Sequence, residues 1–337
     1  MKNLILLTAV ALAATACSDH DELKVPSDAN AITFGTSVQV ETKAVVSGTN
    51  IPSNEKIGIY ALKDVSTPAW AATNEMDNIE ATSNGSGGLD YSPLKTYTED
   101  NIYNFYAYYP HTAANSSEDG IKAATVGASP KLQVTLAKTP EAQADYMYAE
   151  PIENYQRTAA ESGKTQKLVF KHALTQVRFK FKNTETANKV SIVSLQVKDK
   201  DKGTMNITDG TWSNTSATGA NGNTFTLYQP TVSQEVAVAA TFDIPKQLML
   251  FPKTGAEMAA NTTGGLEFVL KLKDNTNTNK DVTITPKVPA GGLEAGKSYL
   301  YTLLYSETAK DFITLSTEVV DWEDAVGGDL PVTPTAP

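Results

Sequence analysis

Few side chains in this sequence could do chemistry. Its 337 residues include three histidines, two arginines and one cysteine. No HExxH spacing is present, so two histidines cannot share a helix face around zinc. The sequence also lacks a GxSxG nucleophile turn and a phosphate-binding glycine-rich loop. We therefore expect no catalytic residues, no metal site, no cofactor and no enzymatic activity.

Two patterns leave weaker chemical alternatives open. Asn275, Asn277 and Asn279 alternate as the ligands of a calcium loop do, but Lys280 stands at the glycine position and Pro286 at that of the bidentate glutamate. We interpret this segment as a turn. A glycan-active enzyme would need a pair of carboxylates, and the 38 acidic residues offer too many pairs to choose one.

The one cysteine, Cys17, follows a segment typical of exported proteins. Lys2 supplies a positive charge, and an apolar stretch over residues 4–14 is too short to span a bilayer. Small residues at 14–16 precede the cysteine, as in a bacterial lipobox, although Ala14 replaces the usual aliphatic residue. We predict a lipoprotein signal peptide over residues 1–16 and a lipid on Cys17, with acyl chains such as palmitate. The alternative is a free or buried cysteine after an ordinary signal peptide.

The charge of the chain limits its partners and its location. A formal net charge of -10 disfavours a nucleic-acid partner, which would require a basic face. A lipid on Cys17 would anchor the chain to a membrane without spanning it. The acidic residues 18–22 resemble the export signal of surface lipoproteins in Bacteroides-type bacteria, and a solvated linker is the alternative.

The secondary structure that must position the side chains named above consists of strands. Apolar and polar residues alternate with the period of two that half-buried strands show. Turn sequences such as Asn-Gly and Asp-Gly separate the apolar runs. Gly35 interrupts the first run and predicts a bulge. The expected strands cover residues 31–40, 56–62, 102–109, 132–136, 168–170, 177–181, 190–197, 225–227, 247–251, 266–272, 282–284, 300–304 and 313–320.

Many short strands without a long helical pattern predict an all-β fold of β-sandwiches. We expect a division into five parts. These are the signal peptide (1–16), an acidic linker with the first strand (17–43), two domains (44–163 and 164–326) and a Pro-rich tail (327–337).

An aromatic run lies in the segment 102–109. Tyr103, Phe105, Tyr106, Tyr108 and Tyr109 occur within seven positions. Such rings are typical of packed sandwich strands, and a surface that stacks on sugars is the alternative.

Residues 170–179, FKHALTQVRF, resemble the FxHALxxV stretch of the fimbrillin family, the type V pilins and pilin-like lipoproteins of Bacteroides and Porphyromonas. The matching positions are Phe170, His172, Ala173, Leu174 and Val177. Other similar pieces follow in family order at 41–44, 56–62, 105–110, 145–149, 296–299 and 321–322. The resemblance implies two transthyretin-like β-sandwich domains in tandem after a lipoprotein signal peptide. It also implies a subunit of the fimbrium, or pilus, that serves cell adhesion at the outer membrane and cell surface.

The resemblance further implies a maturation step. A protease cuts after a basic residue, the first strand leaves, and a strand of a neighbouring subunit fills its place by β-strand addition. The matching cleavage site is between Lys43 and Ala44, and an Arg-specific protease cannot act because no arginine precedes Arg157. The alternative is that Lys43 is an ordinary lysine and the strand stays. The residues expected to fill the groove are Ile32, Phe34, Val38 and Val40.

The expected partners are other fimbrial subunits through strand exchange, the outer membrane through the lipid, and a host or bacterial surface ligand. The donor strand can come from either end of the neighbour, although Pro331 and Pro334 in the tail remove ladder donors. The second interpretation is a surface-anchored lipoprotein that stays uncut, or a fimbrial tip or anchor adhesin, which binds glycan or protein.

Overall fold

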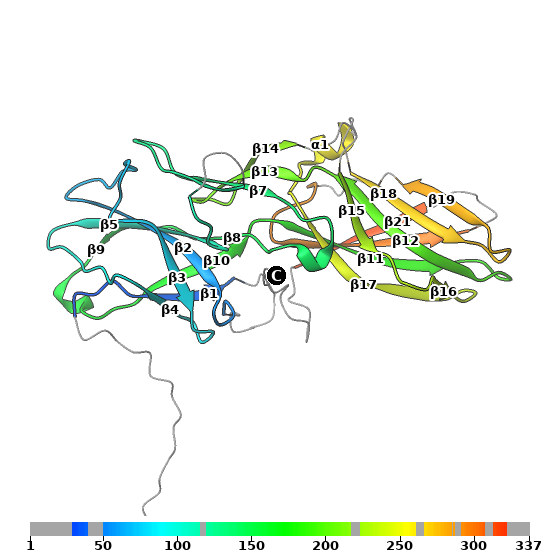
Figure 1. Ribbon diagram of the computed structural model, residues 1–337, viewed down its shortest axis with the longest axis horizontal. Coiled ribbons are helices and arrows are strands. Elements are labelled where there is room, and N and C mark those ends of the chain that lie inside the picture. Colours follow the sequence, from blue (N-terminus) through cyan, green and yellow to red (C-terminus); the bar gives the residue numbers. More distant parts are fainter. Residues whose placement is uncertain are drawn as a thin grey trace, which may run out of the picture.

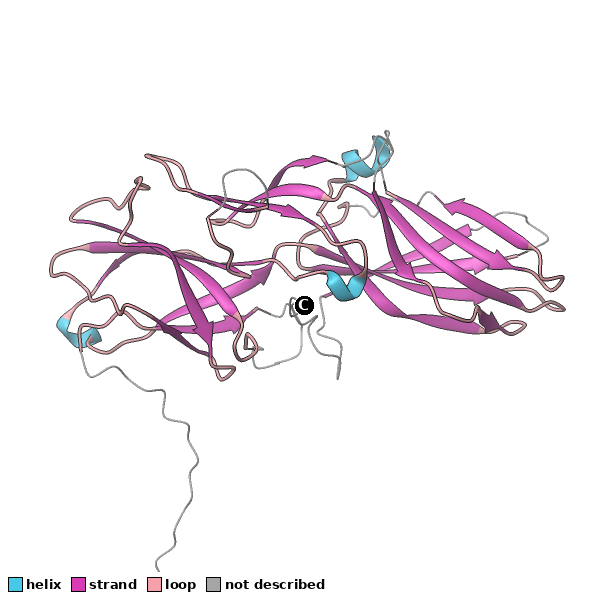
Figure 2. Ribbon diagram, viewed as in Figure 1, coloured by secondary structure: helices cyan, strands magenta, loops and turns pink. Residues whose placement is uncertain are grey.

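The computed structural model describes residues 29–39, 50–114, 119–216, 223–260, 266–284, 286, 291–306 and 313–321. The expected signal peptide, Cys17, Val40, the site at Lys43 and Ala44, and the tail lie outside these residues. Figure 2 shows that most of the described chain is strand. No helix in the described part is long and apolar enough to cross a membrane.

The chain up to residue 172 contributes the strands β1 (Phe34–Val38), β2 (Lys56–Asp64), β3 (Met76–Ser83), β4 (Gly88–Tyr91), β5 (Ile102–Tyr109), β6 (Gly120–Lys122), β7 (Lys131–Thr135), β8 (Met147–Ala149), β9 (Ile152–Gln156) and β10 (Gln166–His172). The later chain contributes β11 (Thr175–Asn183), β12 (Val190–Asp199), β13 (Lys202–Asn206), β14 (Trp212–Ser216), β15 (Asn223–Tyr228), β16 (Gln234–Val236), β17 (Thr241–Leu250), β18 (Glu267–Lys273), β19 (Asn279–Ile284), β20 (Lys297–Tyr305) and β21 (Ile313–Asp321). The short helical segments are η1 (Pro140–Ala142), η2 (Ala159–Glu161) and α1 (Gly255–Ala260).

The first sheet has the order β2-β3-β4-β1-β10-β8-β5-β9, and a further pairing of β2 with β5 closes it on itself. It lies at the left of Figure 1. Its interior holds an apolar cluster that includes Phe34, Ile59, Phe105 and Phe170. A closed sheet has few free edges, so each strand in the ring is fixed on both sides.

Two further sheets, β17-β11-β20-β21 and β15-β12-β18-β19, pack face to face at the right of Figure 1. Rings from both sheets meet in the core: Phe179 lies 4.7 Å from Phe268, and Phe268 lies 4.9 Å from Tyr301, measured between centroids. Both contacts are edge-to-face, the arrangement that aromatic pairs prefer. This half is therefore a β-sandwich.

A fourth sheet, β14-β13-β7-β6, joins the two halves. Its Leu132 and Met205 belong to the same apolar cluster as Tyr60 and Tyr106 on the outer face of the first sheet. Among the described residues, three strand pairings cross the expected boundary at residue 163, because β10 pairs with both β1 and β8, and β7 pairs with β13. The expected domain bounds stay a prediction, and any division of the chain at residue 163 separates strands that pair with each other.

The aromatic strand β5 is buried on both faces. Tyr103 and Phe105 point into the first cluster, whereas Tyr106 and Tyr108 belong to the second. All five aromatic side chains of the run are at most 7% exposed. A glycan-stacking surface on this strand is therefore excluded, and two-sided burial explains why the run is continuous rather than alternating.

Candidate functional site

The first described strand, β1, lies between two neighbours of the closed sheet. Five consecutive pairs join it in parallel to β10, from Phe34 opposite Gln166 to Val38 opposite Phe170. On its other side it pairs antiparallel with β4.

The predicted bulge at Gly35 is wrong, because the register with β10 does not shift. A Cβ at Gly35 would lie 3.1 Å from the Gly87 carbonyl oxygen, so the close approach of the neighbouring backbone favours glycine there.

The side chains of β1 and the residues before it alternate across the sheet. Ile32, Phe34 and Val38 are at most 5% exposed and belong to the interior cluster. The Phe34 ring packs edge-to-face on Phe105 at 5.4 Å and tilted on Tyr91 at 6.0 Å. The structure thus brings three of the four expected groove-filling residues into one core, and Val40 lies outside the described residues. We call the space that β1 fills between β10 and β4 the β1 groove.

Hydrogen bonds to backbone groups hold the β1 segment at both ends. The Ile32 amide donates to the Lys95 carbonyl at 2.9 Å, and the Tyr91 hydroxyl donates to the Ile32 carbonyl at 2.7 Å. At the far end the Gln39 amide donates to the Phe170 carbonyl at 2.7 Å. Removal of β1 would expose the edges of β4 and β10, which could then pair with another strand.

The FxHALxxV segment carries the chain from β10 in the first sheet to β11 in the sandwich. Phe170, Ala173, Leu174 and Val177 are fully buried. The Ala173 carbonyl accepts a 2.7 Å hydrogen bond from the Trp212 indole. The motif therefore lies where the chain crosses from the first sheet to the sandwich. Sequence spacing alone does not predict this position.

His172 is part of this crossing. Its Nδ1 is hydrogen-bonded to Asp145 Oδ2 at 2.6 Å, and both side chains are at most 6% exposed. The described residues contain no cluster of three or more acidic, histidine or cysteine side chains that could hold a metal ion. The buried His172–Asp145 pair links β10 to the segment before β8.

Another buried ion pair lies in the sandwich half. Lys253 Nζ is 2.7 Å from Asp199 Oδ1, and both side chains are almost fully buried. Burial raises the pKa of Asp199 above its ordinary value, although the Lys253 ammonium opposes the shift. The pair joins the end of β12 to the segment after β17, and removal of one partner would leave an uncompensated buried charge.

The segment with alternating asparagines is a hairpin loop between β18 and β19, as expected from the sequence. Asp274 accepts hydrogen bonds from the amides of Thr276 and Thr278, each at 2.9 Å. These donors, with the Thr276 hydroxyl first among them, lower the pKa of Asp274 to about 2. Donors within the loop therefore occupy the carboxylate that a cation would need.

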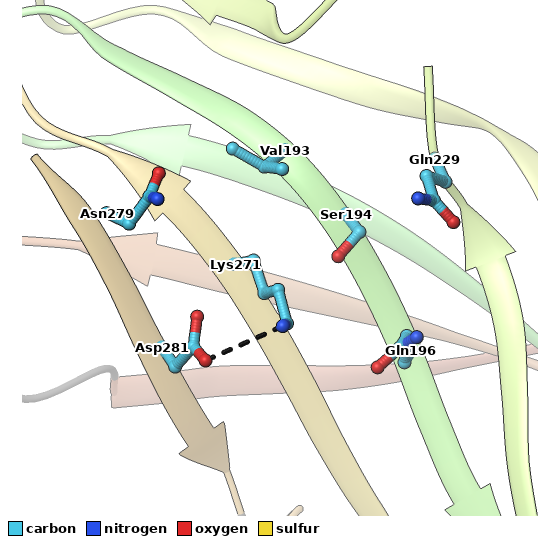
Figure 3. Close-up of a pocket in the computed structure, with 7 residues that line it drawn as sticks. All are labelled: Val193, Ser194, Gln196, Gln229, Lys271, Asn279 and Asp281. Carbon is cyan, nitrogen blue, oxygen red and sulfur yellow. Dashed lines mark ion pairs between the residues drawn. The ribbon is translucent and has the colours of Figure 1, made fainter. Parts of the chain in front are cut away.

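A polar pocket of about 500 Å³ opens on the outer face of the sheet β15-β12-β18-β19 (Figure 3). Lys271 Nζ lies 3.6 Å from Asp281 within it. Register shifts in β12 at residues 192–196 interrupt the pairing beside the pocket. Sequence reasoning missed this pocket, because its residues are common surface types from separate segments. They are Val193, Ser194, Gln196, Gln229, Lys271, Asn279 and Asp281.

The fold and the β1 groove define an all-β protein whose early strand completes a closed sheet, with a β-sandwich following. A family model described as fimbrillin-like matches residues 42–322. The chain belongs to the fimbrillin-like family.

Solved structures of Bacteroides-type proteins have a similar fold. A fimbrial protein from Bacteroides vulgatus matches with a TM-score of 0.60 at 17% identity, covering 87% of this chain and all of that one. A Bacteroides ovatus protein assigned to cell adhesion matches with a TM-score of 0.52 at 18% identity, over 87% of this chain and 98% of that one. One from Parabacteroides distasonis gives a TM-score of 0.53 at 9% identity, over 88% and 98% of the two chains. The comparison with curated proteins finds no match.

Proposed function

We propose that this protein is a structural subunit of a fimbrium. It is exported as a lipoprotein, anchored to the outer membrane through Cys17, cut after Lys43, and assembled when β1 gives way to a strand of a neighbouring subunit. Its role is cell adhesion at the cell surface, without catalysis. Membership of the fimbrillin-like family supports the general role.

The observation that carries strand exchange is the place of β1. The strand is short, lies at the start of the described chain, and pairs on both sides within an otherwise complete sheet. Its last described neighbour, Gln39, is four positions before Lys43. A cut at Lys43 would therefore separate β1 from the rest of the chain, leaving only noncovalent contacts to hold it.

The test is mass spectrometry of the protein in sheared surface fibres and in the membrane. We expect fibre protein to begin at Ala44 and membrane precursor to carry a lipid on Cys17. The variant Lys43→Gln should accumulate as the lipidated precursor outside fibres, whereas Lys24→Gln, a matched change before the cut, should assemble normally. Fibres built from chains that retain residues 29–43 would contradict the proposal.

A second candidate function is recognition of a polar ligand by an adhesin that stays uncut. The observation that favours it is the pocket in Figure 3, where amide, hydroxyl and charged groups converge. Such groups can donate and accept hydrogen bonds to a hydroxyl-rich glycan. Glycan-array binding by the intact protein, lost in Gln196→Ala and kept in Gln234→Ala outside the pocket, would support this function. Equal binding by both variants would exclude the pocket.

A further inference from the structure

One inward position of β1 differs chemically from the others. Thr36 lies between Phe34 and Val38 on the face that points into the core, and it is 4% exposed. Its Oγ1 is buried and has no hydrogen-bond partner among the described residues. A buried hydroxyl without a partner destabilises the structure, because it has lost its hydrogen bonds to water.

Thr36 is fixed in the sheet opposite an apolar residue. Leu168 of β10 stands directly opposite it and is fully buried. The Thr36 amide donates to the Gly87 carbonyl at 2.7 Å, so the backbone is fixed in the sheet. The side chain therefore cannot reach solvent without breaking the pairing that holds β1.

Thr33 in the same segment provides a direct contrast. Its Oγ1 is hydrogen-bonded to Thr165 Oγ1 at 3.0 Å in an exposed setting. The two threonines of this segment thus differ in burial and in hydrogen bonding: the hydroxyl of Thr33 has a partner at the surface, whereas that of Thr36 is buried without one. The other inward side chains, Ile32, Phe34 and Val38, are apolar and well packed.

We propose that the strand that replaces β1 carries an aliphatic side chain of about valine's size where β1 carries Thr36. This inference rests on the strand exchange proposed above and names the chemistry of the partner strand. The replacement removes the unsatisfied hydroxyl and keeps the shape of the side chain, so exchange is favourable even when every other contact is equal. The unsatisfied hydroxyl of Thr36 thus weakens the binding of β1 in the β1 groove and makes its replacement easier.

The inference also fixes two neighbouring positions of the incoming strand. A small residue is favoured in the place of Gly35, because a Cβ there would lie 3.1 Å from the Gly87 carbonyl oxygen. The residue that takes the place of Phe34 must fill the space between Tyr91 and Phe105. The partner strand therefore has the pattern large apolar, small, aliphatic.

Peptide exchange tests this pattern. The full chain, cut after Lys43 with β1 still in place, is incubated with peptides of residues 29–39, and bound peptide is measured by native mass spectrometry. An isotope-labelled wild-type peptide sets the reference. We expect the Thr36→Val peptide to outcompete it by about tenfold, equal to 1.4 kcal/mol. The Thr33→Val peptide should not outcompete it, and Phe34→Asp should not enter.

A measurement on the uncut chain keeps the test independent of exchange rates. Thr36→Val should raise the urea midpoint of the intact protein, and Thr33→Val should not. If labelled wild-type peptide enters but Thr36→Val has no advantage, the inference is wrong while strand exchange stands. If no peptide enters although the Thr36→Val chain is more stable, the proposed strand exchange is wrong, and so is the proposed sequence pattern of the partner strand. An unchanged midpoint in Thr36→Val overturns the inference in either case.

Discussion

At the scale of single residues, the Phe34 side chain anchors β1 in the core of the first sheet. It is 2% exposed and touches two rings, those of Phe105 and Tyr91. Phe34→Ala should destabilise the intact chain by about 3–5 kcal/mol, the usual cost of truncating a buried phenylalanine. Urea unfolding checks this value. Val65→Ala is the control, because Val65 is 73% exposed and should change stability by less than about 0.5 kcal/mol. Equal effects would place Phe34 outside the core.

His111 gives the stability a pH dependence at the same scale. Its Nδ1 lies 3.2 Å from Glu80 Oε2, and burial lowers its pKa below 6.5 while Glu80 opposes the shift. The folded state therefore resists protonation that the unfolded state accepts below pH 6.5, so stability is fully present above that pH and falls as the pH drops.

The variant His111→Gln should flatten this dependence between pH 7.5 and 5.5. Urea midpoints at both values measure it, and the other histidines are common to both proteins. The difference should stay below about 1.4 kcal/mol per pH unit, the limit for one proton. A steeper decline in the variant would mean that the pair with Glu80 dominates over burial.

At the scale of elements, β1 can be locked without changing its inward side chains. Ser37 stands opposite Val169 on β10, and both point to the outer face. Ser37→Cys with Val169→Cys should form a disulfide, because adjacent strands bring Cα atoms within the required range. The locked protein should still be cut after Lys43 but should retain β1 and stay out of fibres.

Fibre yield from cells carrying the double variant measures the effect of this lock. Ser37→Cys alone should assemble normally, and reduction of the double variant should restore assembly. Fibres with β1 still attached by the disulfide would mean that assembly does not use the β1 groove.

Sequence patterns predicted the strands with strong alternation or dense apolar content. Such strands include β1, β5, β11 and β18, because burial on one or both faces dictates their residues. The patterns missed β3 and β14, because their sequences, MDNIEATS and WSNTS, are mostly polar and carry little periodic signal. They also omitted Thr36 from the groove-filling set because threonine is polar, although the period of two places residue 36 on the same face as Phe34 and Val38. Position in the sheet, rather than residue type, decides that role.

At the scale of the whole molecule, neither sequence half contains a complete set of strands. β10 closes the first sheet from beyond residue 163, and β7 pairs with β13 from before it. One apolar cluster also holds Tyr60 and Tyr106 of the first half together with Phe251 of the second. A chain divided at residue 163 therefore leaves unpaired edges and exposed apolar surface on both fragments.

We expect fragments 29–163 and 164–321 to be unfolded or aggregated alone and to regain structure when refolded together. Dispersion of amide signals in NMR spectra distinguishes the two states. The first fragment lacks β10, so β1 loses its parallel partner over all five paired positions. The second lacks β7, so β13 keeps only β14. Well-dispersed spectra and cooperative unfolding from each fragment alone would show instead that the pairings across residue 163 are dispensable. The two halves would then be independent domains with their boundary at the expected place.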